Sequence, residues 1–154
     1  MVRWRRRACV VVLSSVDCFR LSLRSWRSAT AMIGAVIRSV LVVDDDPEFR
    51  ELAGRLLAAS GLSVVGEADS VTAALAAAVQ LKPSAVLADV ELPDGDGVTL
   101  ARELAALPWH PRVVLTSVDG DITTSGEARL AGARAFVVKA DLPDAPLAQL
   151  LGGE

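Results

Sequence analysis

Five polar residues each lie where a short apolar run of the sequence ends: Asp44, Asp45, Asp89, Thr116 and Lys139. Carboxylates that meet in one place raise one another's pKa, so a group of three acids needs a cation beside it. Mg²⁺ prefers oxygen ligands and is commonly held by one or two carboxylates together with a phosphate. If the fold gathers these five residues, they indicate metal-assisted phosphoryl chemistry, with the lysine as a second positive charge and the threonine as a hydroxyl donor.

The sequence contains five short apolar runs rich in Val and Leu, and four of them lead to these polar residues. Each is about five residues long, which suits a strand better than a buried helix. Their starts are 23, 23, 27 and 23 residues apart, and the runs are Ser39 to Val43, Leu62 to Gly66, Ala85 to Asp89, Arg112 to Thr116 and Ala135 to Lys139.

Helical patterns lie between the runs. The first begins behind an Asp46 cap and ends at Ser60-Gly61, and the second begins behind a Ser70 cap and stops before Pro83. Three further helices are expected, and they are about Val98 to Leu107, Ile122 to Ala131 and Ala145 to Leu151.

Alternating strands and helices predict an α/β fold in which a five-stranded parallel sheet has helices on both faces. The run Leu62 to Gly66 has a polar Ser63 inside it, which suits an edge strand, and the strand order 2-1-3-4-5 puts it there. In this order the chain reverses between the first and third strands, and ligands bind beyond the carboxyl ends of strands at such a point. The acids are therefore expected to meet in that crevice.

Four segments together resemble the receiver domains of two-component response regulators, which have a flavodoxin-like, doubly wound fold. They are Leu41-Val42-Val43-Asp44-Asp45, the stretch Asp89 to Gly97, Leu115-Thr116-Ser117 and Phe136-Val137-Val138-Lys139. The stretch Val64 to Ala68 is similar to receivers that usually precede a LuxR-type helix-turn-helix domain, although no such domain is expected within these residues.

The resemblance implies a role for each residue of the crevice. Asp89 would accept the phosphoryl group, Mg²⁺ would be held by Asp44, Asp45 and Asp89, and the backbone carbonyl of Glu91 would be a further ligand. Of the two neighbouring acids, Asp45 would bind the metal directly and Asp44 partly through water.

The resemblance also implies how the signal leaves the site. Lys139 would contact the phosphoryl group, while Thr116 and Phe136 would switch between two positions. The expected partners are a sensor histidine kinase, an unknown downstream protein, and a second copy of the chain through the face of the fourth helix, fifth strand and fifth helix. The receiver itself is expected to make no direct contact with nucleic acid.

Two departures from the family pattern keep an alternative open. Ala140 stands where the family usually has proline after the lysine, and Phe136 replaces the usual tyrosine. A cis bond before a residue other than proline costs about 2.5–4 kcal/mol, so a trans Lys139–Ala140 bond could place the lysine differently. The alternative is a degenerate receiver that binds partners without phosphorylation.

Two other functions fit less well. The turn Asp94-Gly95-Asp96-Gly97 superficially matches the nucleophile loop of haloacid-dehalogenase-like phosphatases, but Leu92-Pro93 separates it from the strand that such a loop should leave directly. A nucleotide-binding α/β domain would need a glycine-rich phosphate loop after the first strand, where this chain has acids. The receiver itself is not expected to be an enzyme.

Charge divides the chain into two parts. Residues 1–38 hold eight Arg and one Asp, whereas residues 39–154 hold eight Lys or Arg and eighteen Asp or Glu. Residues 1–36 are expected to be a basic, disordered extension, and residues 37–154 the receiver domain. Both cysteines, Cys9 and Cys18, lie in the extension, and its apolar runs are too short to cross a membrane, so the cytoplasm is the expected location.

Overall fold

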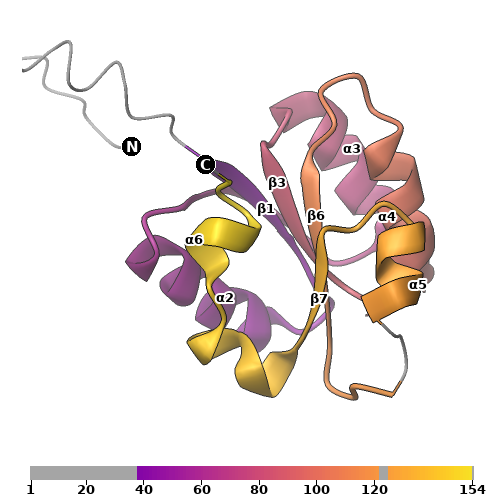
Figure 1. The fold of residues 1–154 in the computed structure, drawn as a ribbon. Helices are drawn as coiled ribbons and strands as arrows, with labels where there is room; N and C mark the ends of the chain where they lie inside the picture. The colour runs from indigo at the N-terminus through magenta and orange to yellow at the C-terminus, as the bar shows by residue number, and fades with distance from the viewer. Residues whose placement is uncertain (1–37, 122–124, 154) are drawn as a thin grey trace, which may run out of the picture. The chain divides into compact units, whose positions relative to one another are not determined.

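A computed structural model describes residues 38–121 and 125–153, so the predicted extension of residues 1–36 lies outside the described residues. Five parallel strands form the central sheet in the order β2-β1-β3-β6-β7, which confirms the predicted order 2-1-3-4-5 (Figure 1). The strands are β1 (Ser39–Val43), β2 (Ser63–Ala68), β3 (Ala85–Asp89), β6 (Arg112–Ser117) and β7 (Ala135–Val138). As expected, β2 lies at an edge, and its side chains alternate in exposure.

Local signals in the sequence account for where the long helices begin. Helix α2 (Pro47–Ala59) starts with proline behind Asp46, whose carboxylate accepts the N–H of Glu48. Helix α3 (Val71–Leu81) starts behind Ser70, whose hydroxyl accepts the N–H of Ala73. The remaining helices are α4 (Gly97–Ala105), α5 (Ser125–Leu130) and α6 (Leu147–Leu150).

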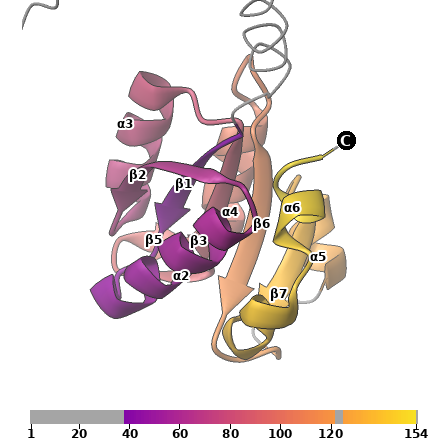
Figure 2. The same ribbon diagram turned by 90° about the vertical axis from the view of Figure 1, so that its left-hand side faces the viewer.

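The sheet is covered on both faces, because alternate residues of each strand point to opposite sides. Leu41 and Val43 of β1 face one core, which α3, α4 and α5 complete. Val40 and Val42 face the other core, which α2 and α6 complete. Figure 2 shows α2 and α6 together in front of the sheet. The structure is thus the doubly wound, flavodoxin-like arrangement that the alternating elements predict.

The last two helices differ from the prediction, and the second strand is shifted to Ser63–Ala68. The last helix is shorter than expected, because a 3₁₀ helix, η1 (Lys139–Asp144), precedes α6. Pro143 lies within η1 and Pro146 caps α6, and proline has no N–H with which to continue an α-helix. Lys139 therefore begins η1 instead of ending a strand. Of the predicted fourth helix, residues 122–124 lie outside the described residues, and α5 covers only Ser125–Leu130.

A short hairpin that the sequence did not predict follows β3. Its two antiparallel strands, β4 (Glu91–Leu92) and β5 (Gly95–Asp96), leave the carboxyl end of β3 and lead directly into α4. The Gly97 N–H donates to the carbonyl of Val90 at 2.8 Å, so the hairpin returns the chain to its own starting point. Residues 91–96 are thereby held beside Asp89.

Candidate functional site

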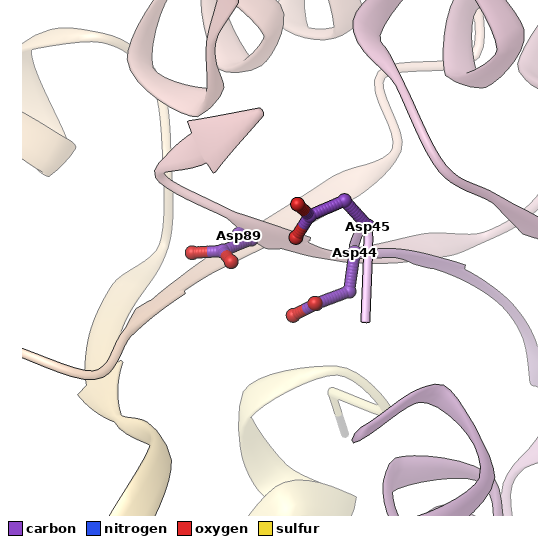
Figure 3. A group of neighbouring side chains, drawn as sticks. All are labelled: Asp44, Asp45 and Asp89. Carbon is purple, nitrogen blue, oxygen red and sulfur yellow. The ribbon is translucent and has the colours of Figure 1, made fainter. Parts of the chain in front are cut away.

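Three carboxylates meet at the carboxyl end of the sheet, as Figure 3 shows. Asp44 and Asp45 follow β1, and Asp89 is the last residue of the neighbouring strand β3. One carboxylate oxygen from each lies within 4.8 Å of the others. Asp44 is fully buried and Asp89 is 5% exposed, whereas Asp45 is exposed to solvent. The cluster is therefore buried at its base and open at Asp45.

Lys139 reaches this cluster from the first residue of η1. Its Nζ lies 2.6 Å from Asp44 Oδ2 and 2.8 Å from Asp89 Oδ2, and it donates a hydrogen bond to Asp89. The same Nζ lies 4.3 Å from the centre of the Phe49 ring on α2, a distance at which the face of the ring attracts the cation. The Lys139–Ala140 peptide bond is trans, and the ammonium still lies between the two acids.

The charges of the cluster are not balanced. Burial raises the pKa of Asp44, against the opposing effects of Lys139 and of the Asp46 N–H. Burial also disfavours the charged form of Lys139, but its close contacts with the carboxylates of Asp44 and Asp89 outweigh that effect and raise the pKa of the lysine. Although Lys139 Nζ lies 2.6 Å away, Asp44 Oδ2 has no partner in hydrogen-bond geometry among the described residues. One ammonium thus faces three carboxylates, two of them buried, and a buried oxygen has a free lone pair.

Glu91 and Thr116 border the same cluster. The Glu91 N–H donates to Asp89 Oδ1 at 3.2 Å, which places the backbone at Glu91 against the acid. Thr116 is fully buried and lies opposite Asp89 in the pairing of β3 with β6. Its hydroxyl donates to the carbonyl of Ala88 at 3.4 Å, a long and therefore weak bond that a better acceptor could replace.

Phe136 lies farther along the sheet, on β7. It pairs in register with Leu115, next to Thr116, and its half-buried ring packs against the core shared by α3, α4 and α5. The five polar residues of the sequence prediction thus meet at one site, and the predicted switch ring lies one strand beyond Thr116.

Reasoning from the sequence missed three residues that support the site. The contact of Phe49 with Lys139 joins residues far apart in the chain and has no local signal in the sequence. Gly97 packs so tightly that a Cβ on it would collide with the backbone carbonyl of Asp89. Asp94 accepts the N–H groups of Val71 and Thr72 at 2.7 and 2.9 Å, which ties the β4–β5 hairpin to the start of α3. The glycines of the turn were the only indication of such close packing.

The two acids of that turn, Asp94 and Asp96, both accept hydrogen bonds from residues at the start of a helix. Besides Asp94, Asp96 accepts the N–H and the hydroxyl of Thr99, both at 2.8 Å, as the N-cap of α4. Backbone N–H groups stabilise the charged form of each and lower the pKa of both. Carboxylates held in this way at helix starts do not form a phosphatase nucleophile loop.

Comparison with known protein families shows which family the chain belongs to. The sequence model of the response regulator receiver domain matches residues 40–148. The chain belongs to that family. This receiver is 39% identical over 105 residues to the DNA-binding transcriptional activator DevR/DosR of Mycobacterium tuberculosis, covering 68% of this chain and 48% of that protein. It is 30% identical over 100 residues to the chemotaxis protein CheY of Bacillus subtilis, covering 65% of this chain and 83% of CheY.

Solved structures agree with this assignment. The signal receiver domain of the response regulator NarL from Mycobacterium tuberculosis is 34% identical with a TM-score of 0.63, covering 71% of this chain and 92% of that one. CheY4 of Vibrio cholerae, at 21% identity, shares the fold with a TM-score of 0.66, covering 77% of this chain and 100% of that one. The receiver spans about half the length of the longer regulators that it matches, 48% of DevR/DosR for example. Among its described residues, no helix combines the length and apolar character needed to span a bilayer.

Proposed function

We propose that this receiver domain accepts a phosphoryl group on Asp89 in a Mg²⁺-dependent step and thereby changes a surface that partner proteins contact. The observation that carries the proposal is the cluster itself. Carboxylate oxygens of Asp44, Asp45 and Asp89 lie within 4.8 Å of one another, with the ammonium of Lys139 touching two of the three acids. A sensor histidine kinase or a small phosphodonor is the proposed source of the phosphoryl group.

The residues present fit a divalent cation. Oxygen donors dominate the cluster, its negative charge exceeds that of one lysine, and Asp44 Oδ2 is buried without a hydrogen-bond partner. Asp44, Asp45, Asp89 and the backbone carbonyl of Glu91 would hold Mg²⁺. When bound, the metal would neutralise charge on the transferred phosphoryl group.

The chain's own groups position the acceptor and the charge around it. The Glu91 N–H and the Lys139 ammonium hold the two oxygens of the Asp89 carboxylate, so its plane is set before the donor arrives. An oxygen of Asp89 forms the new bond to phosphorus as the bond from phosphorus to the donor breaks, and the donor leaves with that electron pair. Lys139 then pairs with a phosphoryl oxygen, and the Thr116 hydroxyl turns from the Ala88 carbonyl to donate to another.

Movements of side chains on β6 and β7 would link phosphorylation of Asp89 to a change at the surface. A shift of Thr116 toward the phosphoryl group frees space beside β7, where the half-buried ring of Phe136 lies in register with Leu115. We propose that Phe136 moves with Thr116 and changes the face of α5, β7 and α6, and that a downstream protein or a second copy of the chain contacts this face. The cytoplasm, where histidine kinases present their phosphoryl groups, is the proposed location, and residues 1–36 are proposed to be a separate basic extension.

The test is the intact mass of the protein after incubation with acetyl phosphate and Mg²⁺. We expect one phosphate adduct on the wild type, none on Asp89→Asn, and none when the divalent cation is chelated. Asp144→Asn is the matched control, because Asp144 is exposed at the end of η1 and loses the same charge. This control should be phosphorylated like the wild type.

The opposite result would favour the binding module that never takes phosphate. If no adduct forms with acetyl phosphate, and if beryllium fluoride with Mg²⁺ also leaves the amide spectrum unchanged, Asp89 is not a phosphoacceptor. An adduct that survives Asp89→Asn would place the modification on another residue.

A further inference from the structure

Three arginines from distant parts of the sequence meet at the opposite end of the sheet from the carboxylates. Arg38 immediately precedes β1, Arg112 begins β6 and Arg134 immediately precedes β7. Together with Ala148, Gln149 and Gly153 they line a hollow of about 740 Å³. The C-terminal segment packs against two of these arginines, because a Cβ on Gly152 would meet the Arg38 side chain and a Cβ on Gly153 would meet the Arg112 guanidinium. The three guanidinium groups therefore share one pocket, which we call the arginine pocket.

Within the part of the chain that the structure describes, the guanidinium groups of the pocket have no carboxylate partners. Ion pairs among the described residues involve Arg50, Arg55 and Lys139 but none of these three arginines. Arg112 donates to the carbonyl of Gly152, which is a neutral group. The domain is nevertheless rich in acids, since residues 39–154 hold eighteen Asp or Glu and eight Lys or Arg. Three cations that converge without an acid repel one another, and a bound anion would remove that repulsion.

The lining indicates which kind of anion would fit. Among the described residues, the lining includes no carboxylate to repel the anion and no aromatic ring on which a base could stack. Guanidinium groups bind phosphate and carboxylate in bidentate fashion, and three of them match an anion of several charges. The Gln149 amide adds a further donor or acceptor. The volume lies within the range of about 300–1,000 Å³ that is common for small-molecule sites.

We propose that the arginine pocket is a second binding site of this receiver, for a compact anion that carries a diphosphate group. The site is separate from the phosphoacceptor, because Asp44, Asp89 and Thr116 lie at the carboxyl ends of the strands and the three arginines lie at the amino ends. Inorganic diphosphate and the diphosphate of a small ester share this chemistry. Anion binding at the pocket would therefore not depend on phosphorylation of Asp89.

The experiment is a titration of the full chain with inorganic pyrophosphate. Mg²⁺ is removed by chelation so that pyrophosphate cannot bind at the carboxylate cluster through the metal. Calorimetry would give the affinity, and amide chemical shifts would locate the site. We expect shifts around residues 38, 112, 134 and 149 and none around Asp89. Arg134→Gln should weaken binding about tenfold, and Arg38→Gln/Arg134→Gln further, because each removes a charge-assisted contact.

The matched control removes two charges elsewhere. Arg55 on α2 and Arg129 on α5 are exposed and do not line the pocket, so Arg55→Gln/Arg129→Gln should leave the affinity within about twofold. Equal losses in the pocket and control variants would reduce the effect to net charge and overturn the proposal. Absence of pyrophosphate binding to the wild type would overturn it as well.

Two further measurements identify the occupant. Comparing pyrophosphate with ADP distinguishes the free anion from its ester, and either one binding at the pocket supports the site. A short DNA duplex that binds more tightly than both, with the same loss in the pocket variants, would make the ligand nucleic acid and overturn the assignment of a compact anion.

Discussion

Removing the charge of Lys139 should destabilise the domain strongly. In Lys139→Met, two buried carboxylates lose the only ammonium within reach among the described residues. At 2.6 and 2.8 Å, and with an effective dielectric constant of about 20, each contact is worth about 6 kcal/mol before desolvation is subtracted. Most of that is offset by the cost of burying the lysine, and breaking a buried pair typically costs about 3–5 kcal/mol. We therefore expect a loss of about 3–5 kcal/mol in the free energy of unfolding.

Urea unfolding at pH 7.5 in a chelating buffer measures this loss. Lys82→Met is the control, because Lys82 is the only other lysine and its Nζ lies 5.9 Å from the Trp109 ring in an exposed position. Its loss should stay below about 1 kcal/mol. Adding Mg²⁺ should stabilise Lys139→Met more than the wild type, since the divalent cation replaces the missing charge. The deficit should also shrink as the pH falls, because burial already raises the pKa of Asp44 and protonation relieves the repulsion.

The same experiment can refute the electrostatic account of the site. A loss for Lys139→Met no larger than that for Lys82→Met would mean that the carboxylates are stable without the ammonium. Equal Mg²⁺ stabilisation of mutant and wild type would mean that the three acids do not hold the cation.

Three further predictions concern the elements around the site. Gly97→Ala should slow phosphorylation of Asp89 and lower the free energy of unfolding, because its Cβ would meet the Asp89 carbonyl. Gly54→Ala, with open space around it, should instead stabilise α2 by about 0.5–1 kcal/mol. Urea unfolding and mass spectrometry of both variants check this prediction, and equal effects of the two substitutions would contradict it. Thr116→Val should slow phosphorylation about ten- to a hundredfold while stability changes by less than about 1 kcal/mol, because only a long hydrogen bond is lost; an unchanged rate would remove Thr116 from the mechanism. Carbon-detected titration of Asp96 should give a pKa below 3.8, because the Thr99 N–H stabilises the carboxylate. The contribution of the Asp96 cap to stability is therefore complete above the pKa of the unfolded chain and is lost as the pH falls through the pKa of the folded protein. A pKa above 3.8 would contradict the capping geometry.

Local sequence determined the strands and the starts of the long helices. Short apolar runs such as Ser39 to Val43 form strands because a central parallel strand is covered on both faces, and four of the five residues of β1 are buried. Asp46 and Ser70 cap helices because their side-chain oxygens reach an N–H two or three residues away. These interactions span only a few residues, so sequence spacing was enough to predict them. The gathering of Asp44, Asp89 and Lys139 followed from placing strand ends within a known strand order.

Tertiary structure decided the contacts that join residues far apart in the chain. The contact of Lys139 with Phe49, the bonds of Asp94 to the start of α3 and the meeting of Arg38, Arg112 and Arg134 depend on how the helices pack and how the strands pair. No local pattern encodes them, because an Arg before a strand or an Asp in a turn reads as a solvated residue until the sheet brings its partner near. The sequence thus determined which residues end the strands, whereas the folded structure determined which side chains meet there. Side chains make contact when they are close in space, and residues that are close in space can be far apart in the sequence.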